Sequence, residues 1–153
     1  MAENDLFFED VAVGDDIPSL ASRATLVQMA MYAAATWDFH RYHYDKEFAQ
    51  SKGFPAPFVD GQMFGGLLTR MLISWTGPNV VLKKLNVKYR VMVFPGEMII
   101  CMGKVAQKYT EGGENLVRCE LWVENENREK VVAPANALLA LPSKSINMNG
   151  VSS

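Results

Sequence analysis

Hydrophobic and polar positions follow helical spacing in the first half of the chain and alternate in the second half. Thr25 followed by Gln28 has the form of a capping box, which predicts a helix over 26–37. A short helix is expected to begin after Asp45, whose side chain suits an N-cap position. A long helix is predicted over 61–75, and because it is apolar on most sides we expect it to be buried.

The second half of the chain has the period-two pattern of strands. Four strands are predicted, over 84–93, 98–109, 117–124 and 131–141. Short connections between consecutive strands favour antiparallel pairing, so the prediction is a four-stranded meander. Residues 7–18 are interpreted as irregular. The pattern indicates an α+β domain with one buried helix.

The chain shows no internal repeat and no low-complexity stretch. Its 153 residues suit one domain, predicted over 1–142. After Pro142 the residues are mostly small and polar, which predicts a flexible tail over 143–153.

Composition excludes several classes of function. Fifteen basic and seventeen acidic residues give a net charge of −2, so a nucleic-acid partner is not expected. Cys101 and Cys119 are too few for a disulfide framework and are expected to be buried in strands. The acidic N-terminus is unlike a signal peptide, and no apolar run reaches the roughly 18 residues of a membrane span. We therefore expect a cytoplasmic protein without a membrane partner.

The candidate chemistry lies in a polar segment, residues 38–45, between two apolar helices. Phosphate-binding and dinucleotide-binding glycine motifs and serine-nucleophile motifs are absent, and the histidine spacing fits no metal motif, so neither a cofactor nor a metal is expected. Asp38 and His43 could converge on a water molecule, as the reversible addition of water requires. From spacing alone, the alternative is that Asp38 ends a helix and His43 packs as an ordinary loop histidine.

Residues 32–45 resemble the signature of the MaoC-like (R)-specific enoyl-CoA hydratases, approximately Asp-x-Asn-Pro-x-His-x-Asp. Residues 8–15 are similar to the opening of that family, and 93–97 are similar to its Pro-Gly-Asp turn. The resemblance covers about residues 7–142. It implies a hotdog fold, in which an antiparallel sheet wraps around one long helix, and a homodimer or higher even oligomer.

The resemblance also implies a reaction and roles for particular residues. Asp38 and His43 would be the catalytic pair that activates water, and the Gly61 N–H would bind the thioester oxygen as enolate charge develops. Thr69 would be a supporting hydroxyl in the substrate site, or would bond back to its own helix. The implied activity is the reversible addition of water to a 2-enoyl-CoA, giving a 3-hydroxyacyl-CoA without a cofactor.

Five positions depart from the family pattern and change the walls of the expected site. The family has Gly, Asn, Pro, His and Met where this chain has, in order, Trp37, His40, Arg41, Asp60 and Gln62. The catalytic pair is retained, so the departures bear on the acyl group. Substrate-contacting roles are accordingly assigned to His40, Asp60 and Gln62.

A carboxylate at position 60, beside an oxyanion donor, would oppose enolate charge. We hypothesise that His40 and Asp60 form an ion pair that neutralises it. The alternative is that Asp60 caps the long helix and His40 points to solvent.

Two other functions remain open. A hotdog thioesterase would direct water at the thioester carbonyl, and the Asp-x4-His spacing argues against it. A non-catalytic hotdog subunit would shape the pocket of a catalytic partner, and loss of the Asn-Pro step favours this alternative.

Overall fold

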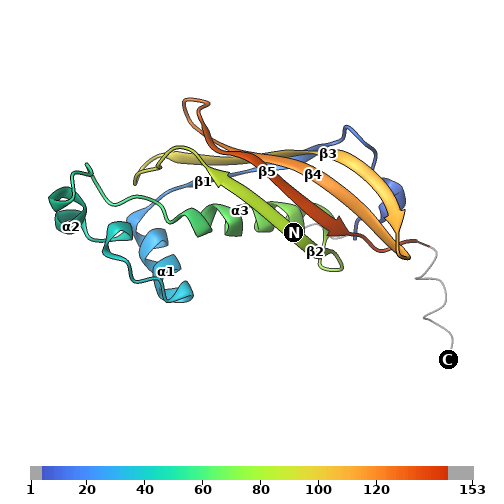
Figure 1. Cartoon of the computed structure of the whole chain (residues 1–153), viewed down its shortest axis with the longest axis horizontal. Coiled ribbons are helices and arrows are strands. Elements are labelled where there is room, and N and C mark those ends of the chain that lie inside the picture. The colour runs from blue at the N-terminus through green and yellow to red at the C-terminus, as the bar shows by residue number, and fades with distance from the viewer. Residues whose placement is uncertain (1–4, 145–153) are drawn as a thin grey trace.

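A five-stranded antiparallel sheet curves over one long helix. This computed structural model describes residues 5–144. Helix α3 (Gly61–Thr76) lies under the sheet, whereas α1 (Leu26–Thr36) and α2 (Lys46–Ser51) gather at one end of the molecule (Figure 1). The predicted α+β architecture, a sheet wrapped around one long helix, is confirmed.

The sheet has the strand order β1-β3-β4-β5-β2. Its strands are β1 (Asp16–Arg23), β2 (Val81–Tyr89), β3 (Met98–Glu111), β4 (Glu114–Asn125) and β5 (Lys130–Ala140). Two short 3-10 helices are also present, η1 (Phe8–Asp10) and η2 (Arg41–His43). All four neighbouring pairs are antiparallel, and β1 and β2 form the two edges.

The predicted four-stranded meander is wrong at both ends. Strand β2 pairs with β5, on the far side of the sheet from β3, so residues 90–97 cross the sheet end. Strand β1 was not predicted, and the segment interpreted as irregular, 7–18, contains only its first three residues. Pro18 and a register shift between Ile17 and Leu20 interrupt its alternation, which hides the strand in the sequence.

The helix starts follow the predicted caps. The Thr25 hydroxyl oxygen accepts the Gln28 N–H at 3.1 Å, and the Gln28 side chain accepts the Thr25 N–H at 3.2 Å. Asp45 accepts the Phe48 N–H at 2.9 Å and begins α2. Local hydrogen bonds therefore fix both helix starts, as a capping pattern predicts.

The core lies between α3 and the concave face of the sheet. Leu68, Met71 and Leu72 are at most 1% exposed and belong to one hydrophobic cluster with buried residues of the strands. The other face of α3 is open, since Arg70 and Ile73 are exposed. The helix predicted to be buried on most sides therefore keeps one face uncovered.

The beginning of the predicted tail contacts η1. The Ser143 hydroxyl donates to the Glu9 carboxylate at 2.6 Å, and Lys144 forms an ion pair with Asp10. The remainder of the predicted flexible tail, 145–153, lies outside the described residues. Across 5–144, none of the helices combines the length and apolar character that crossing a bilayer needs.

Candidate active site

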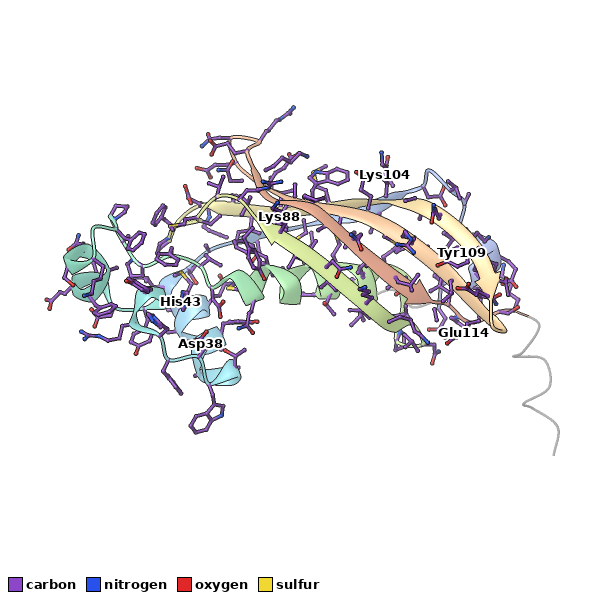
Figure 2. All side chains as sticks on the ribbon, in the orientation of Figure 1. Asp38, His43, Lys88, Lys104, Tyr109 and Glu114 are labelled. Atoms are coloured by element: carbon purple, nitrogen blue, oxygen red, sulfur yellow. The ribbon has the colours of Figure 1, made fainter. Side chains whose placement is uncertain are left out.

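Asp38 begins the loop that follows α1. Trp37 ends that helix with φ 58° and ψ 19°, a left-handed conformation that turns the chain sharply. Asp38 accepts the His40 N–H at 3.2 Å and is half-buried. Figure 2 shows Asp38 and His43 at the same end of the molecule, far from the turn that carries Glu114.

His43 has a fixed ring orientation. Its Nδ1 atom lies 2.9 Å from the Phe58 carbonyl oxygen. A carbonyl oxygen only accepts hydrogen bonds, so Nδ1 carries the hydrogen and Nε2 of the neutral ring carries a lone pair. The half-buried imidazole therefore presents an acceptor, and a potential base, on its other side.

An aromatic cluster supports the loop that carries His43. The rings of Tyr42, Phe54 and Phe58 have centroids 5.1–5.5 Å apart. The Phe58 N–H also donates to the Tyr42 carbonyl oxygen at 3.1 Å. This support was not predicted from the sequence. Its signal was the two phenylalanines flanking Pro55 and Pro57.

Asp60 brings a second carboxylate to the same place. It is the N-cap of α3, and its Oδ1 accepts the Gln62 N–H at 2.9 Å. The residue is 8% exposed, and its Oδ2 is buried without a hydrogen-bond partner. One potential ligand atom each from Asp38, His43 and Asp60 lies within 4.8 Å of the others. The described part of the chain thus contains a cluster able to surround a water molecule or a cation.

The hypothesised ion pair between His40 and Asp60 is wrong. Among residues 5–144, no ion pair or hydrogen bond joins the two side chains. His40 is exposed and stacks on Tyr42 with ring centroids 4.7 Å apart. The structure agrees instead with the alternative to the ion pair, since Asp60 caps α3 and His40 lies at the surface.

Gly61 lies directly beside this cluster. It is the first residue of α3, so its N–H has no intrahelical acceptor. A Cβ atom at this position would lie 3.0 Å from carbon atoms of the Tyr89 ring. Glycine therefore lets the aromatic ring cover the start of the helix.

Two hollows are lined in part by α3. One, of about 450 Å³, lies between α1 and α3, and its apolar walls include Met31, Tyr32, Met63 and Leu67. The other, of about 280 Å³, is lined by Phe58, Gly61, Phe64, Tyr89 and Met92, among others. Burial, together with the negative charge of Asp60, raises the pKa of Tyr32 in the first hollow and of Tyr89 in the second. Asp60 thus acts electrostatically on both hollows.

Two expected substrate-site residues lie outside this arrangement. The Thr69 hydroxyl donates to the Gly65 carbonyl oxygen at 2.9 Å, so Thr69 bonds back to its own helix, the alternative to a role in the substrate site. Gln62 is exposed, and its backbone N–H rather than its side chain contacts Asp60. Neither residue lines the two hollows.

Solved structures share this fold. The (R)-hydratase PhaJ1 from Pseudomonas aeruginosa superposes with a TM-score of 0.84 at 20% identity, covering 92% of this chain and 88% of that one. The (R)-hydratase from A. caviae gives 0.79 at 21% identity, covering 88% and 99%. The ChsH1-ChsH2 complex from Mycobacterium tuberculosis gives 0.76 at 24% identity, covering 85% and 98%. These likenesses identify the hotdog fold.

Sequence comparisons identify the family. A curated relative, the beta subunit of 3-oxo-4,17-pregnadiene-20-carboxyl-CoA hydratase from Mycobacterium tuberculosis, is 27% identical over 93 residues, which are 61% of this chain and 72% of the relative. The MaoC-like domain matches residues 12–127, well over half of the chain. This chain is therefore a member of the MaoC-like dehydratase family.

Proposed function

We propose that this protein is an enoyl-CoA hydratase that adds water reversibly to a 2-enoyl-CoA thioester. The observation that carries the proposal is the convergence of Asp38 and His43, with the Nε2 lone pair of His43 left free by the bond to Phe58. Membership of the MaoC-like family supports hydratase chemistry as the class of reaction.

In the proposed reaction, Asp38 and His43 hold one water molecule. One member of the pair removes a proton as the water oxygen bonds to C3 of the enoyl group. The π electrons move toward the thioester carbonyl, and a proton is returned to C2. The net change adds H and OH across the double bond, and the reverse reaction eliminates water.

The Gly61 N–H is the proposed donor to the thioester oxygen. It is the first free N–H of a sixteen-residue helix, where the helix dipole favours negative charge. A donor fixed in the backbone stabilises developing enolate charge without needing to reorganise. The hollow under Tyr89 opens onto Gly61, so we propose that it receives the thioester end of the substrate.

The apolar hollow between α1 and α3 is the proposed acyl site. Met31 and Met63 form part of its walls, and methionine side chains adapt to irregular acyl shapes. Met29 and Met71, at 2% and 1% exposure, lie in the core and do not line this hollow. A volume of about 450 Å³ accommodates an acyl group larger than a short straight chain.

We further propose that the protein acts in the cytoplasm as a homodimer or a higher even oligomer. Strand β2 has one unpaired edge, and exposed apolar side chains adjoin the site. Trp37 and Phe39 are 83% and 53% exposed. Edge pairing and burial of such side chains are common ways in which subunits associate.

A specific observation favours a second candidate. The curated relative is called a beta subunit, and one structural neighbour is a complex of two named proteins. This chain is therefore alternatively a subunit of a heteromeric hydratase, with or without its own catalytic role. A thioesterase is the less favoured third candidate.

One experiment separates these candidates. The purified protein is incubated with enoyl-CoA thioesters ranging from crotonyl to bulky ring-bearing acyl groups, and both enone absorbance and free thiol are followed. Loss of enone without thiol release supports the hydratase, whereas thiol release supports the thioesterase. No reaction with any thioester would contradict an independent hydratase and favour the heteromeric subunit.

A further inference from the structure

One carboxylate oxygen of Asp60 is buried without a hydrogen-bond donor, which indicates a place where a ligand could bind. Oδ1 of this carboxylate caps α3, whereas Oδ2 is buried and receives no hydrogen bond from the residues that the structure describes. A buried carboxylate oxygen that has lost its water and gained no donor destabilises the fold. Helix capping explains one oxygen of Asp60 and leaves the other unexplained.

Three side chains that can accept hydrogen bonds meet at this position. The carboxylates of Asp38 and Asp60 offer lone pairs, and so does Nε2 of His43 while Nδ1 donates to Phe58. No hydrogen bond or ion pair joins any two of the three side chains, which are all described. The arrangement lacks a donor, so it fits a ligand that supplies protons or positive charge.

The spacing leaves a water molecule within reach of all three side chains. An atom that makes tetrahedral hydrogen bonds of about 2.8 Å holds its partners about 4.6 Å apart. A tetrahedral metal with bonds of about 2.1 Å holds its ligands about 3.4 Å apart. The three ligand atoms all lie within 4.8 Å of one another, a limit that admits a hydrogen-bonded water molecule.

We propose that Asp60 is a third catalytic residue, whose Oδ2 binds the water that is added to the enoyl group. The proposal rests on the hydratase function proposed above. Asp60 accepts one O–H of the water, while the other O–H points at the base and an oxygen lone pair points at C3. During the reaction one O–H bond breaks, its proton moves to the base, and the C3–O bond forms. In the reverse direction the same oxygen position receives the 3-hydroxyl group.

The charge of Asp60 also acts on residues of both substrate hollows. Its charge acts on Tyr32 beside the proposed acyl site and on Tyr89 above Gly61. A negative charge here disfavours the enolate charge that develops near Gly61. Asp60 can therefore favour the reaction only by binding and orienting the water. The proposal therefore predicts that removal of this charge harms turnover more than substrate binding.

Two substitutions separate the water-binding role from the helix cap. Asn is as good an N-cap as Asp, but when its amide oxygen caps α3, its NH2 group replaces the Oδ2 acceptor with a donor. Ser also caps a helix, and its shorter side chain leaves room for a small carboxylate such as formate. Asp45→Asn is the control for loss of a capping carboxylate, because Asp45 caps α2 outside the cluster and its Oδ2 bonds to Arg41 instead of facing the cluster.

The test measures hydration by Asp60→Asn, Asp60→Ser, Asp38→Asn and Asp45→Asn on the best enoyl-CoA, with thermal unfolding as the check of folding. We expect kcat to fall at least about 100-fold in both Asp60 variants, with KM changed less than about threefold. Added formate should raise the kcat of Asp60→Ser by about tenfold or more and leave the kcat of Asp38→Asn unchanged. Asp45→Asn should stay within about twofold of the parent.

Other outcomes overturn the proposal, and they differ from failure of the proposed function. A folded Asp60→Asn or Asp60→Ser variant with near-parental kcat would contradict the catalytic role of Asp60 and would leave the proposed hydratase function unaffected. If dialysis against EDTA abolishes the activity of the parent protein, the cluster holds a metal ion in place of the water, and the proposed role of Asp60 is wrong. A parent that hydrates no substrate overturns both the hydratase proposal and the role of Asp60.

Discussion

Nδ1 of His43 lies 2.9 Å from the carbonyl oxygen of Phe58, which places the hydrogen on Nδ1 and leaves Nε2 as an acceptor. The contact comes from the backbone of the segment that leads into α3, so the ring is oriented by the fold itself. Phe58 is in turn tied to Tyr42, the neighbour of His43, by its own N–H. The candidate base and the start of α3 are thus held in one unit.

Replacing His43 with alanine should lower the rate of hydration by about 10²–10⁴-fold, the usual contribution of a general base. The ring is only half-buried, so the variant should remain folded. Steady-state rates on the best enoyl-CoA, with circular dichroism as the folding check, measure this effect. A folded His43→Ala variant with parental turnover would remove His43 from the mechanism.

Trp37 should make a measurable contribution to backbone strain. Its φ of 58° is a left-handed conformation that costs a residue other than glycine about 1 kcal/mol. Trp37→Gly and Trp37→Ala lose the same exposed ring, so their difference reports the backbone. We expect Trp37→Gly to exceed Trp37→Ala by about 1 kcal/mol in the free energy of unfolding. Urea unfolding at one protein concentration tests this, and equal stability of the two variants would contradict it.

The two cysteines should be inert in the folded protein. Burial raises the pKa of both Cys101 and Cys119 from 9.0 to about 12. At pH 8 a thiol reagent should therefore label neither residue until the protein is unfolded. Rapid labelling of the native protein at this pH would contradict the burial of these thiols.

The same raised pKa values predict a loss of stability at alkaline pH. Between about pH 9 and 12 the unfolded thiols ionise while the folded ones keep their protons, so the unfolded state binds fewer protons. The free energy of unfolding should then fall by about 1.4 kcal/mol per pH unit for each thiol. The double variant Cys101→Ala/Cys119→Ala should show a shallower decline, and an unchanged slope would argue against this cause.

Local signals account for what the sequence predicted correctly. The starts of α1 and α2 depend on hydrogen bonds within three residues, at Thr25 and Asp45. The partner of β2 depends on a crossing connection, and β1 is interrupted at Pro18, so alternation alone indicated neither. Strand pairing between distant segments has no short-range signature in a single chain.

In the candidate site, too, local sequence signals predicted some of the residues, whereas others depend on contacts between distant segments. Asp38 and His43 share one loop, and their spacing together with the family resemblance predicted that they converge. Asp60 comes from a different segment, and the bond between Phe58 and His43 is one contact that ties the start of α3 to the loop. The hypothesised partner His40 instead stacks on Tyr42, a preference that depends on the three-dimensional course of η2.

The proposed assembly predicts a mass that is an even multiple of the 17.1 kDa chain. Light scattering at micromolar concentration should therefore give about twice or four times that mass, because β2 and the exposed side chains near Trp37 would be covered. A stable monomer at this concentration would contradict the homo-oligomer and direct attention to a different partner chain.

The most direct test of the central claim is the initial rate of enone loss with the parent protein and with Asp38→Asn on the same enoyl-CoA. The substitution preserves the shape of the side chain and the acceptor for the His40 N–H, and it removes the carboxylate charge and replaces the second acceptor oxygen with an NH2 donor. Our account predicts that the parent hydrates the substrate without releasing thiol, and that Asp38→Asn is slower by about 10²–10⁴-fold while unfolding at a similar temperature. A folded Asp38→Asn protein with near-parental turnover would contradict the proposed mechanism.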